Sequence, residues 1–205
     1  MTRIKFCGLT RLCDIMAANE LSPEYIGFVF APESRRYIPP CKAAELKAAL
    51  HPDIRAAGVF VNENAETVAE FLNGGLIDIA QLHGCEDGEY IKRLRKLTDK
   101  PLIQAFRIRT ESDIANAGLS SADYVLLDSG AGTGKAFDWR LIQGFKKPFF
   151  LAGGLGPDNA GEAVRQLHPY GVDVSSGIET DGVKDKHKMA AFAAAVRKGD
   201  KNDEH

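Results

Sequence analysis

The chain has 205 residues, of which 44% are hydrophobic and 26% charged, and its formal net charge is −2. Such a balance is ordinary for a globular protein and gives no global reason to expect a nucleic acid or an anionic membrane as partner. No apolar run approaches the length of about 18 residues that a membrane-spanning helix needs. The 4 cysteines include no C-x-x-C pair and no zinc-ligand spacing, so we expect reduced thiols and a cytoplasmic protein.

Strand-like and helix-like stretches alternate along the whole chain, as judged from apolar periodicity and from the positions of glycine and proline. The expected strands cover residues 3–10, 25–30, 56–61, 78–83, 102–108, 124–128, 149–152 and 172–175. The expected helices cover residues 12–21, 41–50, 65–72, 89–97, 111–117, 139–144, 158–167 and 186–196. Residues 198–205 are polar and charged and are expected to form a loose tail.

Eight strands that are each followed by a helix, spaced by about 20 to 30 residues, are the pattern of a (β/α)8 barrel. The expected fold class is therefore α/β, with one barrel domain over residues 1–197 followed by the tail at 198–205. A doubly wound open sheet is the alternative, but it seldom contains eight regular units without a fingerprint for its ligand. In such barrels the active site lies at the C-terminal ends of the strands, and phosphate binds around the loops after strands seven and eight.

The first strand ends in a pair of chemically reactive side chains. Ile4 and Phe6 alternate with Lys5 and Cys7, so the ammonium and the thiol point the same way. An isolated cysteine is more often a buried core residue than a catalytic one. At the end of a barrel strand, with a cation two residues away, Cys7 is also a candidate for the active site.

Polar side chains also end or follow several other strands. They are Arg35 and Arg36 after the second strand, Gln81 and His83 on the fourth, Asp128 on the sixth, and Asp173 on the eighth. An aspartate that ends an apolar strand is a frequent catalytic arrangement in barrels, although Asp128 could equally cap or brace a loop. One strand-end histidine and scattered aspartates are a poor ligand set, so we predict no metal. We expect His83 to be a hydrogen-bonded pocket or core residue rather than a catalyst.

Two glycine-rich stretches resemble nucleotide-binding loops but depart from them. In GAGTGK at 130–135, only three residues separate Gly130 from Gly134, and Ala136 stands where Ser or Thr would hold magnesium. In GLG at 154–156, the third small residue of a dinucleotide fingerprint is replaced by Asn159. We therefore predict neither a nucleoside triphosphate nor a dinucleotide cofactor.

Simpler phosphate-binding features occur where barrels use them. Gly153 and Gly154 follow the seventh strand, Pro157 and Asp158 open a helix, and Gly177 follows the eighth strand. Small residues let backbone amides approach an anion, and helix N-termini attract it. Tight turns alone would also explain these glycines, but both stretches lie on the loops where barrels bind phosphate.

Taken together, these segments make the chain resemble the phosphoribosylanthranilate isomerases of tryptophan biosynthesis. The matching segments are KFCGLT at 5–10, GFVF at 27–30, SRRY at 34–37, GVFVN at 58–62, QLHG at 81–84, LLD at 126–128, GTGK at 132–135, FDW at 137–139, LAGGL at 151–155, and VDVSSGIE at 172–179 followed by Gly182 and KD at 184–185. They cover nearly the whole chain in the expected order. The resemblance implies an isomerase without a cofactor that acts on a small sugar phosphate. It further implies no nucleic-acid or membrane partner and a monomer or homodimer.

The same resemblance implies roles for single residues. Cys7 would be the general base and Asp128 the general acid of an Amadori rearrangement of N-(5-phosphoribosyl)anthranilate to 1-(2-carboxyphenylamino)-1-deoxyribulose 5-phosphate. Arg36, chosen over Arg35 because it stands next to Tyr37, would bind the anthranilate carboxylate. The phosphate-binding residues would be Gly134, Gly153, Gly154, Ser176 and Gly177, and the supporting residues Lys5, Gln81, His83 and Asp173.

Lys5 has two possible roles beside Cys7. A nearby cation favours a thiolate, so Lys5 would help to activate the proposed base. Alternatively, Lys5 forms a salt bridge to a strand-end carboxylate such as Asp173 and serves the structure alone.

Other barrel functions need different residues. Indole-glycerol-phosphate synthase would need a Lys/Glu acid–base set at the strand ends, and pentose-phosphate epimerases a histidine-rich metal site; neither set is evident in this chain. A catalytically silent sugar-phosphate-binding barrel would keep the glycine loops and lose Cys7 or Asp128, whereas this chain has both.

Overall fold

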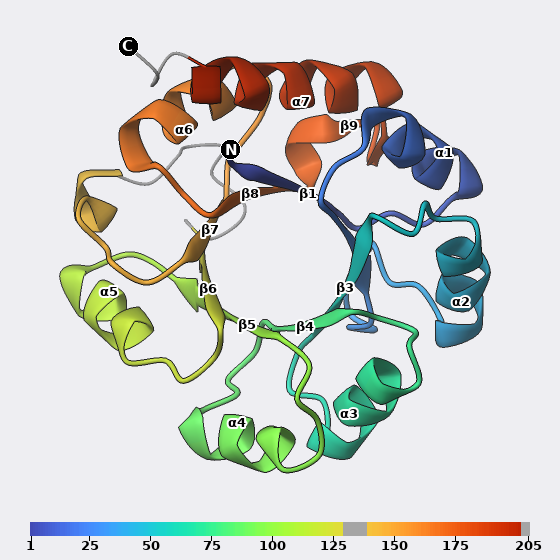
Figure 1. Cartoon of the computed structure of the whole chain (residues 1–205), viewed down its shortest axis with the longest axis vertical. Coiled ribbons are helices and arrows are strands. Elements are labelled where there is room, and N and C mark those ends of the chain that lie inside the picture. The colour runs from blue at the N-terminus through green and yellow to red at the C-terminus, as the bar shows by residue number, and fades with distance from the viewer. Residues whose placement is uncertain (129–138, 202–205) are drawn as a thin grey trace.

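A closed barrel of eight parallel strands forms the centre of the molecule (Figure 1). The computed structural model describes residues 1–128 and 139–201. The strands follow one another around the barrel as β1 (Arg3–Cys7), β2 (Tyr25–Val29), β3 (Arg55–Phe60), β4 (Ile79–Leu82), β5 (Leu102–Arg107), β6 (Tyr124–Asp128), β7 (Phe149–Ala152) and β8 (Gly171–Val174). β8 pairs in parallel with β1, with Gly171 opposite Arg3, and this closes the sheet. The predicted (β/α)8 barrel is confirmed, and the open sheet is excluded.

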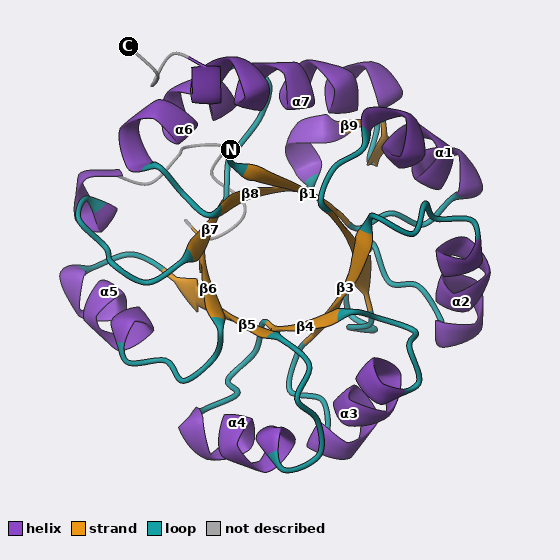
Figure 2. Ribbon diagram, viewed as in Figure 1, coloured by secondary structure: helices purple, strands orange, loops and turns teal. Residues whose placement is uncertain are grey.

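The helices form an outer ring around the strands (Figure 2). In the described residues they are α1 (Leu12–Leu21), α2 (Pro40–Ala48), α3 (Ala65–Asn73), α4 (Gly88–Arg95), α5 (Glu111–Gly118), α6 (Ala160–Leu167) and α7 (Lys186–Lys201). Where we predicted a helix over 139–144, the structure has only a 3₁₀ turn, η1 (Trp139–Ile142). Within the stretch 3–10, β1 ends at Cys7, the predicted end of the strand, and Gly8 turns the backbone with a φ of 78°.

A short antiparallel hairpin after β8 is missing from the sequence-based prediction. It follows the 3₁₀ turn η2 (Ser176–Ile178), and its strands are β9 (Glu179–Thr180) and β10 (Val183–Lys184). Between them, Asp181 and Gly182 have φ values of 51° and 80°, as a two-residue type I′ turn requires. The Asp-Gly pair signals this turn, but strands of two residues are too short to show an alternating pattern. The hairpin places Glu179 opposite Lys184.

Helix α7 extends through residues 198–201, so the predicted boundary between barrel and tail at residue 197 is wrong. Gly199, which reads as the end of a helix, lies in contact with α6: a Cβ there would be 2.8 Å from the Gly161 carbonyl oxygen. Asp200 accepts hydrogen bonds from the backbone N–H and the hydroxyl of Thr2, at 3.0 and 2.7 Å. The remaining part of the predicted tail, 202–205, lies outside the described residues.

Aromatic side chains fill the N-terminal end of the barrel. Tyr25 and Tyr124 both pack edge-on against Phe150, with ring centroids 5.5 and 5.9 Å apart. The hydroxyl of Tyr170 lies 3.1 Å from that of Tyr124, and the Arg3 guanidinium stacks over the Tyr170 ring. A filled N-terminal end leaves the C-terminal ends of the strands as the place where a substrate can enter, as is usual in this fold.

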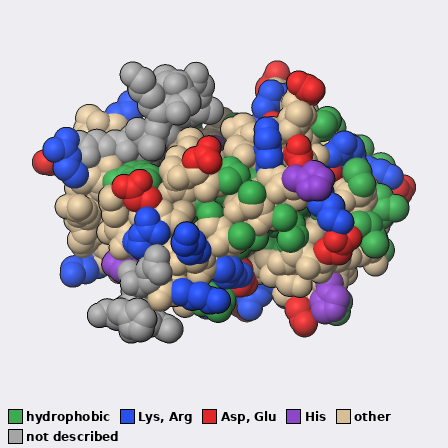
Figure 3. Space-filling model, turned by 90° about the horizontal axis from the view of Figure 1, so that it is seen from above, with side chains coloured by type: hydrophobic (Ala, Val, Ile, Leu, Met, Phe, Trp, Pro, Cys, Tyr) green, Lys and Arg blue, Asp and Glu red, His purple; other side chains and the backbone are tan. Residues whose placement is uncertain are grey.

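The surface carries both signs of charge. Acidic and basic side chains are interspersed on the face shown in Figure 3, in keeping with the small net charge of the chain. Among the described residues, no helix is both long enough and apolar enough to cross a membrane.

Candidate active site

Strand β1 directs Lys5 and Cys7 into the barrel. Phe6, between them, packs outward against Phe192 of α7, with ring centroids 6.4 Å apart, so its neighbours face inward. Lys5 is fully buried, and 7% of Cys7 is exposed. A Cβ at Gly27 would lie 2.8 Å from the Cys7 Sγ and 3.2 Å from the Lys5 Nζ. Glycine at this position of β2 therefore makes room for the thiol and the ammonium side by side.

A buried salt bridge joins β1 to β8. The Nζ of Lys5 donates to Oδ1 of Asp173 at 2.7 Å. This is the pairing that the sequence offered as the structural alternative for Lys5. Burial by itself disfavours the ammonium, but the charges of Asp173 and Cys7 outweigh it and raise the pKa of Lys5. Lys5 therefore remains a cation beside the thiol.

The environment of Cys7 holds opposing influences on its ionisation. Burial is the largest, and together with the negative charge of Asp173 it raises the pKa of the Cys7 thiol. Lys5 acts the other way, through its charge and a hydrogen bond to the sulfur, and Lys184 adds a smaller effect of the same sign. The net result is a thiol that is protonated at neutral pH, whose thiolate depends on the two lysines.

His83 connects Gln81 to Asp128 across the C-terminal ends of β4 and β6. The Nε2 of Gln81 lies 2.8 Å from Nδ1 of His83, and Nε2 of His83 lies 3.7 Å from Oδ2 of Asp128. Gln81 is 1% exposed, and its Oε1 has no hydrogen-bond partner among the described residues. The predicted pocket histidine thus contacts both the buried amide and the candidate acid.

Arg36 lies over the turn that follows Cys7. A Cβ at Gly8 would overlap the Cδ of Arg36, so glycine there lets the stem of the arginine cross the backbone. The guanidinium binds Glu179 through two hydrogen bonds, from Nε to Oε1 at 2.6 Å and from Nη2 to Oε2 at 2.9 Å. Arg36 is thereby fixed next to the end of β1.

The loops after β7 and β8 touch each other. Gly153 and Gly154 have φ values of 84° and 67°, which favour glycine. Gly177 lies against the carbonyl oxygen of Leu155, where a Cβ would overlap that oxygen. Helix α6 begins only at Ala160, two residues later than predicted. Ser176 lies in η2 beside Gly177, whereas Gly134, the remaining predicted phosphate-binding residue, lies outside the described residues.

Comparison with known proteins identifies the family. Residues 4–195 match the family described as N-(5'phosphoribosyl)anthranilate (PRA) isomerase. The N-(5'-phosphoribosyl)anthranilate isomerase of Endomicrobium trichonymphae is 43% identical over 202 residues, which cover 96% of this chain and 99% of the relative. The chain belongs to the phosphoribosylanthranilate isomerase family. It is therefore an isomerase of tryptophan biosynthesis.

Solved structures of this family have the same fold. The phosphoribosylanthranilate isomerase of Thermotoga maritima matches with a TM-score of 0.88 at 34% identity, over 96% of this chain and 99% of that one. A complex of such an isomerase with reduced 1-(o-carboxyphenylamino)-1-deoxyribulose 5-phosphate matches with a TM-score of 0.87 at 33% identity and the same coverage. Monomers generated from the dimeric Thermotoga maritima isomerase match with a TM-score of 0.85 at 33% identity, over 96% and 99% of the two chains.

Two charged residues beside the candidate site, Glu179 and Lys184, have no role predicted from the sequence. Glu179 is buried and accepts hydrogen bonds from Arg35 at 2.8 Å and from Lys184 at 2.6 Å, besides those from Arg36. Lys184 also donates to the backbone oxygen of Ser175 at 2.9 Å. The one local signal that could have paired them is the Asp-Gly turn of the hairpin that carries both.

The charges of this cluster are mutually dependent. Burial lowers the pKa of Lys184, against the opposing effect of Glu179. Burial acts to raise the pKa of Glu179, but hydrogen bonds from Arg36 and Lys184 prevail and lower it. Glu179 is therefore an anion that holds several cations near the end of β1.

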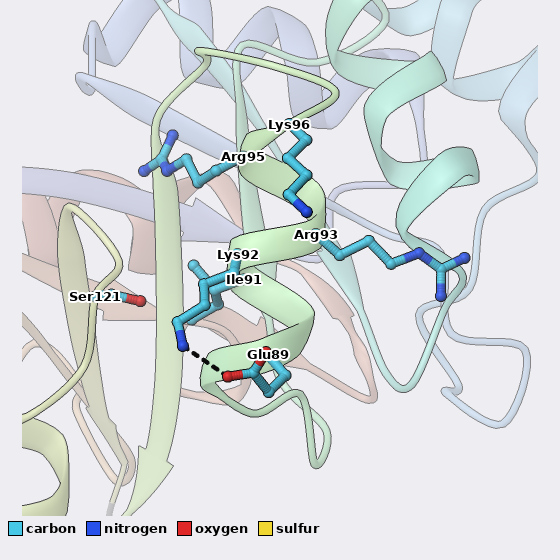
Figure 4. A pocket seen from close by; sticks show the side chains of 7 residues that line it. All are labelled: Glu89, Ile91, Lys92, Arg93, Arg95, Lys96 and Ser121. Carbon is cyan, nitrogen blue, oxygen red and sulfur yellow. Dashed lines mark hydrogen bonds and ion pairs between the residues drawn. The ribbon is translucent and has the colours of Figure 1, made fainter.

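A hollow lies on the outer ring of helices, away from the candidate site (Figure 4). Its lining residues are Glu89, Ile91, Lys92, Arg93, Arg95, Lys96 and Ser121. Lys92 is paired with Glu89, and Arg93 with Glu66, both at 2.6 Å. The lining of this hollow contains no residue from the C-terminal end of a barrel strand. The paired charges of α4 in it form a solvated face of the helix.

The described ranges contain no group of three or more His, Cys, Asp and Glu residues placed to hold a metal ion. The sequence-based expectation of a metal-free, cofactor-free site stays a prediction.

Proposed function

We propose that this isomerase catalyses the Amadori rearrangement of N-(5-phosphoribosyl)anthranilate, with Cys7 as general base and Asp128 as general acid. The observation that carries the proposal is the position of both groups at the C-terminal ends of strands of one barrel, β1 and β6. That end is where barrel enzymes do their chemistry. A buried thiol beside a cation and a carboxyl beside a histidine are matched to proton transfer at two separated atoms.

The reaction needs one proton delivered and one removed. Asp128 would protonate the ribose ring oxygen, so that the ring opens to a Schiff base. The Cys7 thiolate would then take the proton from C2, and the electron pair of that bond moves toward the nitrogen to give an enolamine. The enolamine tautomerises to the ketone. No electrons are exchanged with a cofactor in any of these steps.

The two ends of the substrate are anions with candidate partners in the structure. Arg36 would bind the anthranilate carboxylate, for which a planar guanidinium is suited. Backbone amides around Gly154 and Gly177, and those of Ser176 and Gly153, would bind the phosphate. We further propose that the protein is cytoplasmic and that it is a monomer or a homodimer.

A direct assay tests the proposed reaction. Phosphoribosylanthranilate is generated in the cuvette, and its fluorescence should fall when the protein is added. The same protein with Cys7→Ser and Asp128→Asn together should leave the signal unchanged. A steady signal with the wild-type protein would contradict the proposal and favour a barrel that binds sugar phosphates without turning them over.

We predict that inorganic sulfate or phosphate binds at the amides near Gly154 and Gly177. Gly177→Ala should weaken the binding of a product analogue by at least about tenfold, because the new Cβ would collide with the Leu155 carbonyl and separate the two loops. Gly88→Ala is the matched control, since a Cβ at this residue of α4 meets no atom within 4 Å. Crystals soaked with the analogue should show the phosphate at these loops, and density elsewhere would refute the prediction.

Arg36→Met should weaken substrate binding far more than Arg35→Met. The lost charge-assisted contact is worth about 1.5–3 kcal/mol, or roughly a ten- to hundredfold rise in KM. The two arginines form a matched pair because both bind Glu179, while the Arg35 side chain is 61% exposed and that of Arg36 only 21%. Steady-state kinetics would decide, and equal small effects would place the carboxylate elsewhere.

Lys5→Met should raise the pKa of Cys7 further, whereas Asp173→Asn should lower it, because the two charges act on the thiol with opposite sign. Alkylation of Cys7 is measured against pH in a background in which the exposed Cys13, Cys41 and Cys85 are replaced by serine. Lys5→Met also leaves the carboxylate of Asp173 unpaired, at a cost of about 3–5 kcal/mol in stability. The measurements are therefore made well below the melting temperature. An unchanged thiol pKa in both variants would leave Lys5 with a structural role alone.

A further inference from the structure

Glu179 is a buried carboxylate that the proposed acid–base chemistry does not use. It is 9% exposed, and its two oxygens receive hydrogen bonds from three cationic side chains. Its backbone oxygen accepts a further hydrogen bond from Lys188 of α7, at 2.7 Å. A carboxylate tied down at so many points has a fixed position and orientation.

The contact between Glu179 and Arg36 uses one particular edge of the guanidinium. Oε1 and Oε2 of Glu179 accept from Nε and Nη2, which form one of the two donor forks of an arginine. No described residue accepts a hydrogen bond from Nη1 of Arg36. The second fork, made by Nη1 and the other hydrogen of Nη2, therefore remains for a second carboxylate.

The opposite side of Arg36 is also fixed. Its stem crosses Gly8, the residue after Cys7, where no other side chain fits. With the stem held at Gly8 and the Nε edge held by Glu179, the plane of the guanidinium is determined. Orientation matters for a bidentate contact, because both N–H groups must point at the two oxygens at once.

We propose that Glu179 is a positioning residue that orients Arg36 toward the aryl carboxylate of the substrate, and that it thereby sets the preference for carboxylate-bearing arylamines. This inference rests on the proposed function, since it assumes that Arg36 receives the anthranilate carboxylate. Glu179 touches no reacting atom. Its effect is on recognition at one end of the substrate.

The opposite hypothesis is competition. If Glu179 occupied the fork that the substrate needs, binding would have to break the ion pair, and removal of Glu179 would strengthen binding. The two hypotheses therefore predict changes of opposite sign in the affinity for a carboxylate-bearing ligand, and the use of the Nε edge by Glu179 favours positioning.

The experiment compares two ligands, reduced 1-(o-carboxyphenylamino)-1-deoxyribulose 5-phosphate and the same molecule without the carboxylate. Their dissociation constants are measured by calorimetry for the wild type and for Glu179→Gln, which keeps the size of the side chain but removes its charge. The preference for the carboxylate-bearing ligand should fall by about tenfold in the variant, with little change for the other ligand. In an Arg36→Met background, Glu179→Gln should produce no further loss of preference.

Matched variants separate positioning from general stability. Glu24→Gln removes another partly buried carboxylate, one that binds the Ile4 N–H and Arg197 at the N-terminal end of the barrel, and it should leave the preference unchanged. Should Glu179→Gln fail to fold, Glu179→Asp keeps the negative charge but shortens the side chain by one methylene, which withdraws the carboxylate from the Nε edge of Arg36. The same loss of preference is expected.

Each other result overturns the inference. An unchanged preference means that Arg36 needs no help from Glu179. Tighter binding of the carboxylate-bearing ligand means competition, and an equal loss for both ligands means that Glu179 maintains the site as a whole. If the wild type binds neither ligand, or binds both with the same affinity, the proposed function fails, because no carboxylate is then recognised. That failure is seen in the wild type alone and is thus distinct from a failure of the inference about Glu179.

Discussion

Replacement of Asp128 by asparagine is expected to lower kcat by about 10²–10⁴-fold, the usual contribution of a general acid, and to leave binding of a product analogue almost unchanged. The amide has nearly the shape of the carboxyl group and cannot deliver a proton to the ring oxygen. Asp128 ends β6, its side chain is 20% exposed, and it faces the Nε2 of His83 at 3.7 Å. This environment provides a route to solvent by which the acid can be reloaded after each turnover.

A matched control lies at the other end of the same strand. Asp123 precedes β6 and accepts a hydrogen bond from the Leu102 N–H, so Asp123→Asn should reduce stability without reducing kcat. Single-turnover kinetics and analogue binding are measured for both variants. Substantial turnover by Asp128→Asn would move the acid role to another group, with Asp173 the next to test. Asp173 is the weaker candidate because Lys5 already holds its carboxylate at 2.7 Å.

The alternation of side chains along the barrel strands predicted the part of the site that lies on those strands. The alternation in β1 placed Lys5 and Cys7 on one face, and the end of β6 placed Asp128 at the same edge of the barrel. Asp173 is predicted only as one strand-end carboxylate that could pair with Lys5, and the closure of β8 onto β1 brings the two together. The structure pairs those two residues in register. Residue alternation and the positions of the strand ends were enough to place Lys5, Cys7 and Asp128.

The cluster around Glu179 could not be predicted in the same way. Glu179 is 143 residues from Arg36 along the chain, and it lies in a two-residue strand whose period cannot be read. Its buried position depends on the Asp181–Gly182 turn, which brings Lys184 opposite it. The end of α7 was missed for a related reason. Gly199 serves a close contact with α6, and no local pattern distinguishes that use of glycine from the end of a helix.

Cys7→Ser should impair turnover by about 10²–10⁴-fold, the usual contribution of a general base. An alcohol is far too weak an acid to form its anion near neutral pH, whereas a thiol supplies a small fraction of thiolate. Because serine is nearly isosteric, the pocket beside Gly27 should still accept the side chain and the product analogue should still bind. Cys13→Ser, the same change at an exposed cysteine of α1, is the control and should have no effect.

The pH dependence of the wild type should identify Cys7 as the titrating group. Burial raises the pKa of the thiol above its ordinary value, so the thiolate is the minor form at neutral pH. Below that pKa its fraction grows tenfold per pH unit, and the alkylation rate of Cys7 should therefore rise with a slope of about one through neutral and mildly alkaline pH. In kcat/KM of the wild type this rise is opposed by the requirement for a protonated acid at Asp128, so the residual kcat/KM of Asp128→Asn, which lacks that requirement, should follow the alkylation curve. If the residual turnover of Asp128→Asn were independent of pH while alkylation still rose, the thiolate would not be the base, and the proton at C2 would have to be taken by another group.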